Sequence, residues 1–224
     1  MKAVFFDLDG TLLDTAPDFA LVVNQLRERH GYDPLPYAAI RSTVSHGARA
    51  LIELAFSLRE GEAVFEQRKQ ELLDLYLNNL GERTVLFSGL DNLLDWLERN
   101  DIPWGIVTNK PRAYTDPILS AFGFTTRCQS IVCPDEVSQP KPHPEPLFLA
   151  AKQASCDPQQ AVYIGDHRRD IEAGRAAGMK TIAAGYGYID HNDPSESWSA
   201  DFHVSEPEQL LPLLEQHFNT QSIL

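Results

Sequence analysis

From about residue 86 onward, short apolar segments alternate with segments of helical periodicity, and this order restricts the fold more than any other feature of the chain. The apolar segments show little inside-outside alternation, which is typical of strands buried on both faces. Helices between consecutive strands supply the crossover connections that a parallel sheet requires. We therefore expect an α/β fold with a parallel sheet, whose strands lie within 2–8, 103–110, 129–137, 161–166 and 180–187, with a last edge strand in 201–206.

A block with only helical periodicity separates the first expected strand from the others. Between about 17 and 80, apolar residues recur at helical spacing, and the first helical segment closes on Gly31. The segment AAIRSTVSHGARALIELAF continues the same period. We therefore predict an inserted all-helical cap domain, residues 16–85, within a core domain that comprises residues 1–15 and 86–224.

The composition argues against several classes of partner. The 224 residues are 43% hydrophobic and 23% charged, which is ordinary for a globular protein with a buried core. The net charge of −13 argues against binding to nucleic acid, because such proteins neutralise phosphates with Lys and Arg. We see neither a leader-like N-terminus nor the run of roughly 20 apolar residues that spans a bilayer. We expect a cytoplasmic protein that binds neither nucleic acid nor membrane.

Polar side chains gather where the expected strands end. The first strand runs into Asp7 and Asp9, which lie two residues apart and therefore project to the same side. In open parallel sheets, ligands bind beyond the carboxyl ends of the strands, so polar residues that follow several strands are expected to share one crevice. Besides the first pair, these residues are Thr108, Asn109, Lys141, Asp166 and Asp170.

Four carboxylates in one crevice repel one another and require a cation. Mg²⁺ suits them, because it binds one or two carboxylates together with phosphate and water. Mg²⁺ and Lys141 against the four carboxylates leave one formal negative charge, which a single proton would neutralise. We hypothesise that Asp9 carries this proton, because its neighbours are acidic.

A phosphoryl group fits the remaining residues. Lys141 supplies positive charge and Thr108 a hydroxyl donor. The loop with Gly10 is expected to present backbone N–H groups to phosphate oxygens. Asp7 would act as the nucleophile and form an aspartyl-phosphate. Asp9 would protonate the leaving oxygen and then accept a proton from the water that cleaves the intermediate. The expected partner is a small phosphorylated metabolite.

The motifs DLDGT, VTN, KPHP and GDHRRD, in this order, resemble those of the haloacid dehalogenase superfamily of phosphatases, and the likeness covers nearly the whole chain. The resemblance implies a Rossmann-like parallel-sheet core with an inserted helical cap. It also implies Mg²⁺-dependent hydrolysis of a phosphomonoester.

The resemblance assigns roles by motif position. It implies that Asp7 is the nucleophile and Asp9 the acid and base. It implies a phosphate site of Thr108, Asn109 and Lys141. The metal ligands that it implies are Asp7, the carbonyl of Asp9, and Asp166, with Asp170 in support.

Within this superfamily, the chain is similar to the phosphoglycolate phosphatase branch. The segments VSHGARALIELAF, GIVTNKP and VCPDEV, and YGYI followed by WSAD, resemble bacterial N-acetylmuramic acid 6-phosphate phosphatases. The resemblance implies N-acetylmuramic acid 6-phosphate as the substrate, in cytoplasmic cell-wall recycling. A 2-phosphoglycolate phosphatase and a sugar-phosphate mutase on the same scaffold are the alternatives.

Two other functions fit the residues less well. A dehalogenase needs no proton donor such as Asp9, because halide leaves without one. A phospho-accepting receiver lacks an inserted helical domain and is usually about half as long.

Several residues carry both a functional and a structural interpretation. His46 and Arg49, beside Gly47 in the cap, are candidates for contact with the non-phosphate part of the substrate, and a polar helix face explains them equally well. Asp170 is also a suitable N-cap for the helix that follows it. Tyr186 and Tyr188 are expected mainly to pack.

Overall fold

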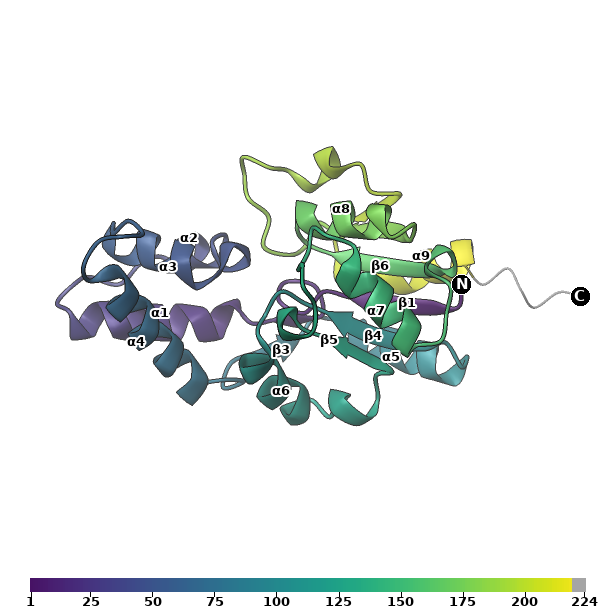
Figure 1. Ribbon diagram of the computed structural model, residues 1–224, viewed down its shortest axis with the longest axis horizontal. Coiled ribbons are helices and arrows are strands. Elements are labelled where there is room, and N and C mark those ends of the chain that lie inside the picture. The colour runs from purple at the N-terminus through teal and green to yellow at the C-terminus, as the bar shows by residue number, and fades with distance from the viewer. Residues whose placement is uncertain (219–224) are drawn as a thin grey trace, which may run out of the picture. The chain divides into compact units, whose positions relative to one another are not determined.

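The computed structural model describes residues 1–218, and the chain divides into two compact units (Figure 1). Unit 1 comprises Met1–Leu13 and the chain from Leu86 onward, and unit 2 comprises Asp14–Val85. The sequence prediction placed the inserted domain at 16–85. The chain passes between the units in β2 (Leu13–Asp14) and β3 (Val85–Leu86), which pair as a two-stranded sheet.

Within the described residues, unit 1 contains a six-stranded sheet in the order β5-β4-β1-β6-β7-β8, and every neighbouring pair is parallel. Figure 1 labels β5, β4, β1 and β6 of this sheet. The central strand β1 is buried at all of its positions, which explains its uninterrupted apolar sequence. The predicted α/β fold with a parallel sheet is confirmed. The strands are β1 (Ala3–Phe6), β4 (Trp104–Val107), β5 (Ser130–Val132), β6 (Ala161–Gly165), β7 (Lys180–Ala184) and β8 (Phe202–Val204).

Amphipathic helices bury the sheet. On one face, Leu147 and Ala150 of α7 (Glu145–Gln153) and Ala173 of α8 (Arg168–Ala176) pack with apolar side chains from the strands. In α5 (Leu90–Arg99), the leucines that recur at helical spacing are all buried, and the helix contacts α9 (Leu210–Phe218). Unit 1 also contains α6 (Arg112–Ala121).

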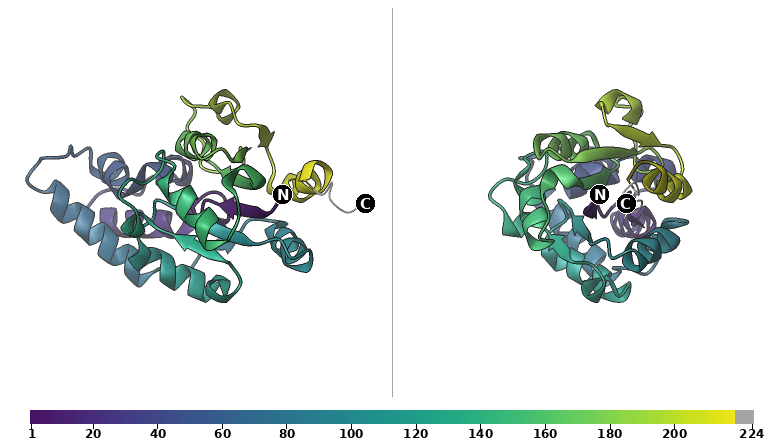
Figure 2. Two further views of the ribbon diagram at one scale, coloured as in Figure 1. Left: turned by 45° about the vertical axis from the view of Figure 1, so that its right-hand side comes forward. Right: turned by 90° about the vertical axis from the view of Figure 1, so that its right-hand side faces the viewer.

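A long excursion connects β7 to β8, and it stands out from the sheet in both views of Figure 2. It contains the 3₁₀ turn Ser195–Trp198, which contacts α8 and β7. The Arg168 Nε atom lies 3.0 and 2.9 Å from the two carboxylate oxygens of Asp193 and joins the excursion to α8. The predicted last strand, in 201–206, is confirmed as β8 at the edge of the sheet.

Unit 2 is helical, with α1 (Ala16–Arg29), α2 (Tyr37–Arg41), α3 (Gly47–Phe56) and α4 (Phe65–Asn78). Helices α1 and α4 pack together, and the rings of Phe19 and Tyr76 stack at 4.0 Å between centroids. The continuous helical period predicted across AAIRSTVSHGARALIELAF is wrong, because the chain breaks into α2, a 3₁₀ turn and α3. The Thr43 hydroxyl donates to the Ala39 carbonyl at this break, and Gly47 has φ +80°.

None of the helices in residues 1–218 has the length and hydropathy needed to cross a bilayer.

Candidate active site

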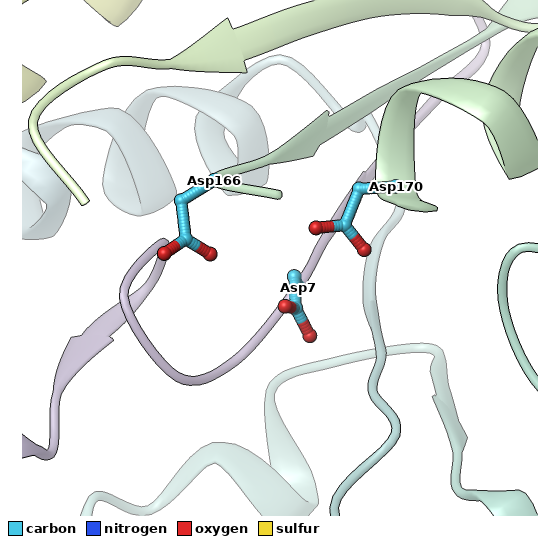
Figure 3. A group of neighbouring side chains, drawn as sticks. All are labelled: Asp7, Asp166 and Asp170. Carbon is cyan, nitrogen blue, oxygen red and sulfur yellow. The ribbon is translucent and has the colours of Figure 1, made fainter. Parts of the chain in front are cut away.

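Three carboxylates converge at the carboxyl ends of the central strands (Figure 3). Asp7 follows β1, Asp166 follows β6, and Asp170 lies in the first turn of α8. One oxygen of each lies within 4.8 Å of the others. The pairing of Phe6 with Ile164 in neighbouring parallel strands brings the first two together, as the strand-end rule predicts.

The Asp166 side chain is held in place at both oxygens. The Thr11 hydroxyl donates to Oδ1 at 3.0 Å, and the Tyr188 backbone N–H donates to Oδ2 at 2.8 Å. Burial raises the pKa of Asp166 well above its ordinary value, and the carboxylates of Asp7 and Asp170 raise it further. The two hydrogen bonds oppose this rise without cancelling it. The residue therefore lies in a rigid, anion-rich position that a cation would stabilise.

Lys141 supplies positive charge to this cluster. Its Nζ atom lies 2.9 Å from Asp7 Oδ1 and 2.7 Å from Asp170 Oδ1, and its side chain is 1% exposed. The same ammonium donates to the Val107 carbonyl at 2.9 Å and to the Tyr163 hydroxyl at 2.8 Å. Burial alone would lower the pKa of Lys141, but the Asp170 and Asp7 carboxylates raise it above its ordinary value. Lys141 is therefore a charged member of the site.

Asp7 is the most exposed carboxylate of the three, and one of its oxygens lacks a hydrogen bond. Burial raises the pKa of Asp7 to about 6, and the attraction of Lys141 offsets part of the effect. Oδ1 lies at ion-pair distance from Lys141, yet it accepts no hydrogen bond from the described residues. A buried carboxylate oxygen without a hydrogen bond, in a cluster of oxygen ligands, fits a hard divalent cation such as Mg²⁺.

Asn109 contacts the backbone of Lys141. Its Nδ2 atom donates to the Lys141 carbonyl at 2.9 Å, and the Lys141 N–H donates to Asn109 Oδ1 at 3.1 Å. The amide predicted to bind phosphate thus fixes the loop that carries the lysine. Thr108 is buried, and its N–H donates to the Val132 carbonyl at 3.0 Å.

Asp9 pairs with a second lysine that the sequence interpretation did not assign to the site. The Nζ atom of Lys110 lies 2.8 Å from Asp9 Oδ1. The charge count behind a protonated Asp9 omitted this ammonium group. The position of Lys110 directly after the Thr108–Asn109 strand end was the available signal.

The Gly10 N–H is engaged within its own loop, where it donates to the Leu13 carbonyl at 2.9 Å. Binding of phosphate by backbone N–H groups of this loop stays a prediction. Gly10 has φ +82°, and a Cβ added to it would lie 2.1 Å from Asp166 Oδ2. Glycine is therefore required here because the backbone turns left-handed against a site carboxylate.

The segment after β7 also contacts residues of the site. Tyr186 and Tyr188, which lie in this segment, were expected mainly to pack as part of the protein interior. Besides the Tyr188 N–H bond to Asp166, the Tyr186 hydroxyl donates to the Thr11 carbonyl at 2.8 Å. A Cβ added to Gly187 would lie 2.2 Å from Asp166 Cβ. The pattern GYGY directly after a strand was the signal for this contact.

Asp170 is the N3 residue of α8, so its assignment as the N-cap is wrong. The N-cap is His167, whose Nδ1 accepts from the Arg169 N–H at 3.1 Å. Asp170 Oδ2 accepts from the His167 N–H at 3.0 Å, which completes a capping box. This arrangement leaves Asp170 Oδ1 directed at Lys141.

The two cap candidates belong to unit 2. His46 ends the 3₁₀ turn Val44–His46 and precedes α3. Arg49 lies on α3, pairs with Glu60, and has a side chain that is 59% exposed. Contact of either residue with a substrate stays a prediction.

The chain was also compared with known proteins. Residues 4–184 match the family model described as haloacid dehalogenase-like hydrolase. The chain is 43% identical over 216 residues to the N-acetylmuramic acid 6-phosphate phosphatase of Pseudomonas aeruginosa, covering 96% of each protein. It is 42% identical over 209 residues to the phosphoglycolate phosphatase of Xanthomonas campestris, covering 93% of this chain and 94% of that protein.

A solved structure shares the fold. The crystal structure of a predicted phosphoglycolate phosphatase from Haemophilus somnus has a TM-score of 0.83 and 26% identity, and the match covers 95% of this chain and 97% of that one. The resemblance inferred from the motifs is confirmed. The chain belongs to the haloacid dehalogenase-like hydrolase family.

Proposed function

We propose that this protein is a Mg²⁺-dependent phosphomonoesterase that forms an aspartyl-phosphate on Asp7, with N-acetylmuramic acid 6-phosphate as its substrate. The observation that carries the proposal is the setting of Asp7. It lies at the end of the central strand, beside the buried Lys141 ammonium and within 4.8 Å of two further carboxylates. This setting combines a nucleophile, a positive charge and a place for a divalent cation.

In the first step, a carboxylate oxygen of Asp7 attacks phosphorus, and the bond from phosphorus to the ester oxygen breaks. Asp9 donates a proton to the departing alkoxide, so an alcohol leaves. In the second step, Asp9 takes a proton from water, whose oxygen attacks the phosphorus of the aspartyl-phosphate. Inorganic phosphate is released, and the Asp7 carboxylate and the Asp9 proton are restored.

Asp7, the carbonyl of Asp9, and Asp166 would hold Mg²⁺, with Asp170 in support. When bound, the ion neutralises charge on the carboxylates and on the phosphoryl group. Thr11 and the Tyr188 N–H orient Asp166 for this task. Lys141 and Thr108 would contact the phosphoryl oxygens, and Asn109 would position Lys141 through its backbone.

The names of the relatives support a carboxylate-bearing substrate. Those reported above are named for N-acetylmuramic acid 6-phosphate and for phosphoglycolate, both of which are phosphomonoesters with a carboxylate. The higher identity and fuller coverage favour N-acetylmuramic acid 6-phosphate, and 2-phosphoglycolate is the second candidate. We place the reaction in the cytoplasm, as part of the same proposal.

A substrate panel tests the proposal. We expect phosphate release with Mg²⁺ and the highest kcat/KM for N-acetylmuramic acid 6-phosphate, compared with 2-phosphoglycolate and glucose 6-phosphate. A kcat/KM for 2-phosphoglycolate that is higher by about tenfold, or roughly 1.4 kcal/mol, would reverse the order of the two candidates. An Asp7→Asn variant should abolish release, because it removes the nucleophile.

The same assay separates hydrolysis from phosphoryl transfer within a sugar. A mutase returns the phosphoryl group to its substrate and requires a bisphosphate activator. Steady release of phosphate without such an activator supports hydrolysis, and its absence would favour the mutase.

A further inference from the structure

The site contains a second buried lysine that the mechanism above does not use. The Lys110 side chain is 6% exposed, and its Nζ atom lies 2.8 Å from Asp9 Oδ1. The Asp9 side chain is 18% exposed, so the ion pair is largely shielded from solvent. A pair this shielded is held more firmly than an exposed surface pair.

The backbone of each residue in this ion pair is held by contacts with neighbouring residues. The Lys110 N–H donates to the Thr108 hydroxyl at 3.1 Å, and the Thr115 hydroxyl donates to the Lys110 carbonyl at 3.1 Å. On the other side, Asp9 forms a β-bridge with Leu13. The ion pair therefore connects the segment after β4 to the segment after β1 and is one contact that holds the Asp9 carboxylate.

The two lysines contact different carboxylates of the site. Lys141 contacts Asp7 and Asp170, and Lys110 contacts Asp9. Against the four carboxylates, the two ammonium groups leave a formal charge of −2, which one divalent cation neutralises.

We propose that Lys110 is a positioning residue for Asp9, and this inference rests on the proposed phosphomonoesterase activity. Its ammonium holds the Asp9 carboxyl, two residues beyond Asp7, where the ester oxygen of a substrate bound at Asp7 would depart. Lys110 acts through Asp9 and not on the phosphoryl group. Its contribution therefore depends on how much the leaving oxygen needs a proton.

Two esters that differ in their leaving group test this role. N-acetylmuramic acid 6-phosphate releases an alkoxide, which needs a proton, whereas p-nitrophenyl phosphate releases a stable phenolate. The kcat/KM value reports the steps up to departure of the leaving group, so later hydrolysis of the intermediate does not obscure it. We expect Lys110→Met to lower kcat/KM about tenfold or more for the sugar phosphate and less than about threefold for the aryl phosphate.

Three further variants complete the experiment. Lys110→Gln should lower kcat/KM for the sugar phosphate and the aryl phosphate by the same unequal factors. It replaces Lys110→Met if that variant does not fold. Lys180→Met removes an ion-paired lysine at the start of β7, remote from the strand ends of the site, and should change neither value. In an Asp9→Asn background, the Lys110 substitution should cause no further loss for the sugar phosphate, because the group that it positions is gone.

The outcomes are distinct. Equal losses for the two esters, or an added loss in the Asp9→Asn background, would overturn the positioning role while the phosphomonoesterase activity stands. A wild-type protein that hydrolyses neither ester would overturn the proposed function itself, and this inference with it.

Discussion

Two glycines allow the backbone to approach a single carboxylate. Gly10 and Gly187 both lie against Asp166, where an added Cβ would come within 2.1 and 2.2 Å of that side chain. Contacts this short are impossible for a real side chain, so any larger residue must displace the carboxylate or the loop. The proposed metal site therefore depends on residues that carry no chemistry of their own.

At this scale we predict that Gly187→Ala weakens Mg²⁺ binding by about 10- to 100-fold, because it displaces Asp166 and its Tyr188 N–H donor. Isothermal titration with Mg²⁺ measures the effect without substrate. Gly123→Ala is the matched control, because its Cβ meets no atom within 4 Å, although its φ of +69° makes the substitution slightly destabilising. A folded Gly187→Ala protein with wild-type affinity would contradict the assignment.

At the scale of elements, one buried aspartate joins the first and last segments of unit 2. Asp18 lies in the first turn of α1 and is fully buried. It accepts hydrogen bonds from the Gly81 N–H at 2.9 Å, the Arg83 N–H at 2.7 Å and the Thr84 hydroxyl at 2.6 Å. The carboxylate thereby joins the start of α1 to the segment that leads into β3.

We predict that Asp18→Ala lowers the free energy of unfolding by about 2–4 kcal/mol, because three donors lose a charged acceptor in a buried position. Urea denaturation followed by circular dichroism measures the change. Asp74→Ala, on the exposed face of α4, should cost less than about 0.5 kcal/mol. Similar stability losses in the two variants would show that the Asp18 contacts do not stabilise unit 2.

At the scale of the whole molecule, the crowded carboxylates couple stability to pH and to metal. Burial raises the pKa of Asp7 to about 6, and that of Asp166 also rises. Between the unfolded value near 3.8 and these folded values, the native state binds more protons than the unfolded chain. The contribution of these groups is therefore favourable at low pH and is lost as pH rises through the folded pKa values.

We predict that the difference in melting temperature between protein in excess Mg²⁺ and protein in EDTA depends on pH. The stabilisation by Mg²⁺ should be small near pH 5 and larger near pH 7.5, reaching about 2.7 kcal/mol when the ion is present at about 100 times its Kd. Asp166→Asn should be more stable than wild type in EDTA near pH 7.5 and should respond little to the ion. A stabilisation by Mg²⁺ that does not depend on pH would contradict this coupling.

The amino-acid sequence alone determined the layout of the core and which carboxylates gather at the strand ends. Hydrophobic periodicity and the polar residues at strand ends are local properties of the sequence. They could therefore be recognised without knowing which other segments pack against each strand. Asp7, Asp166 and Asp170 were assigned to one crevice in this way, and the structure brings them together. The break near Gly47 was missed, because side-chain bonds to the backbone override periodicity there.

Tertiary structure alone decided which groups hold these residues in place. Lys110 meets Asp9 across 101 positions of the chain, Asn109 holds Lys141 across 32, and the Tyr188 N–H holds Asp166 across 22. Such partners depend on which strand ends are neighbours, and that order is set by packing of the sheet as a whole. A strand's own sequence encodes its burial but not the loops that meet at its end. The convergence of the carboxylates at the strand ends was therefore predictable, and the groups that hold them in place were not.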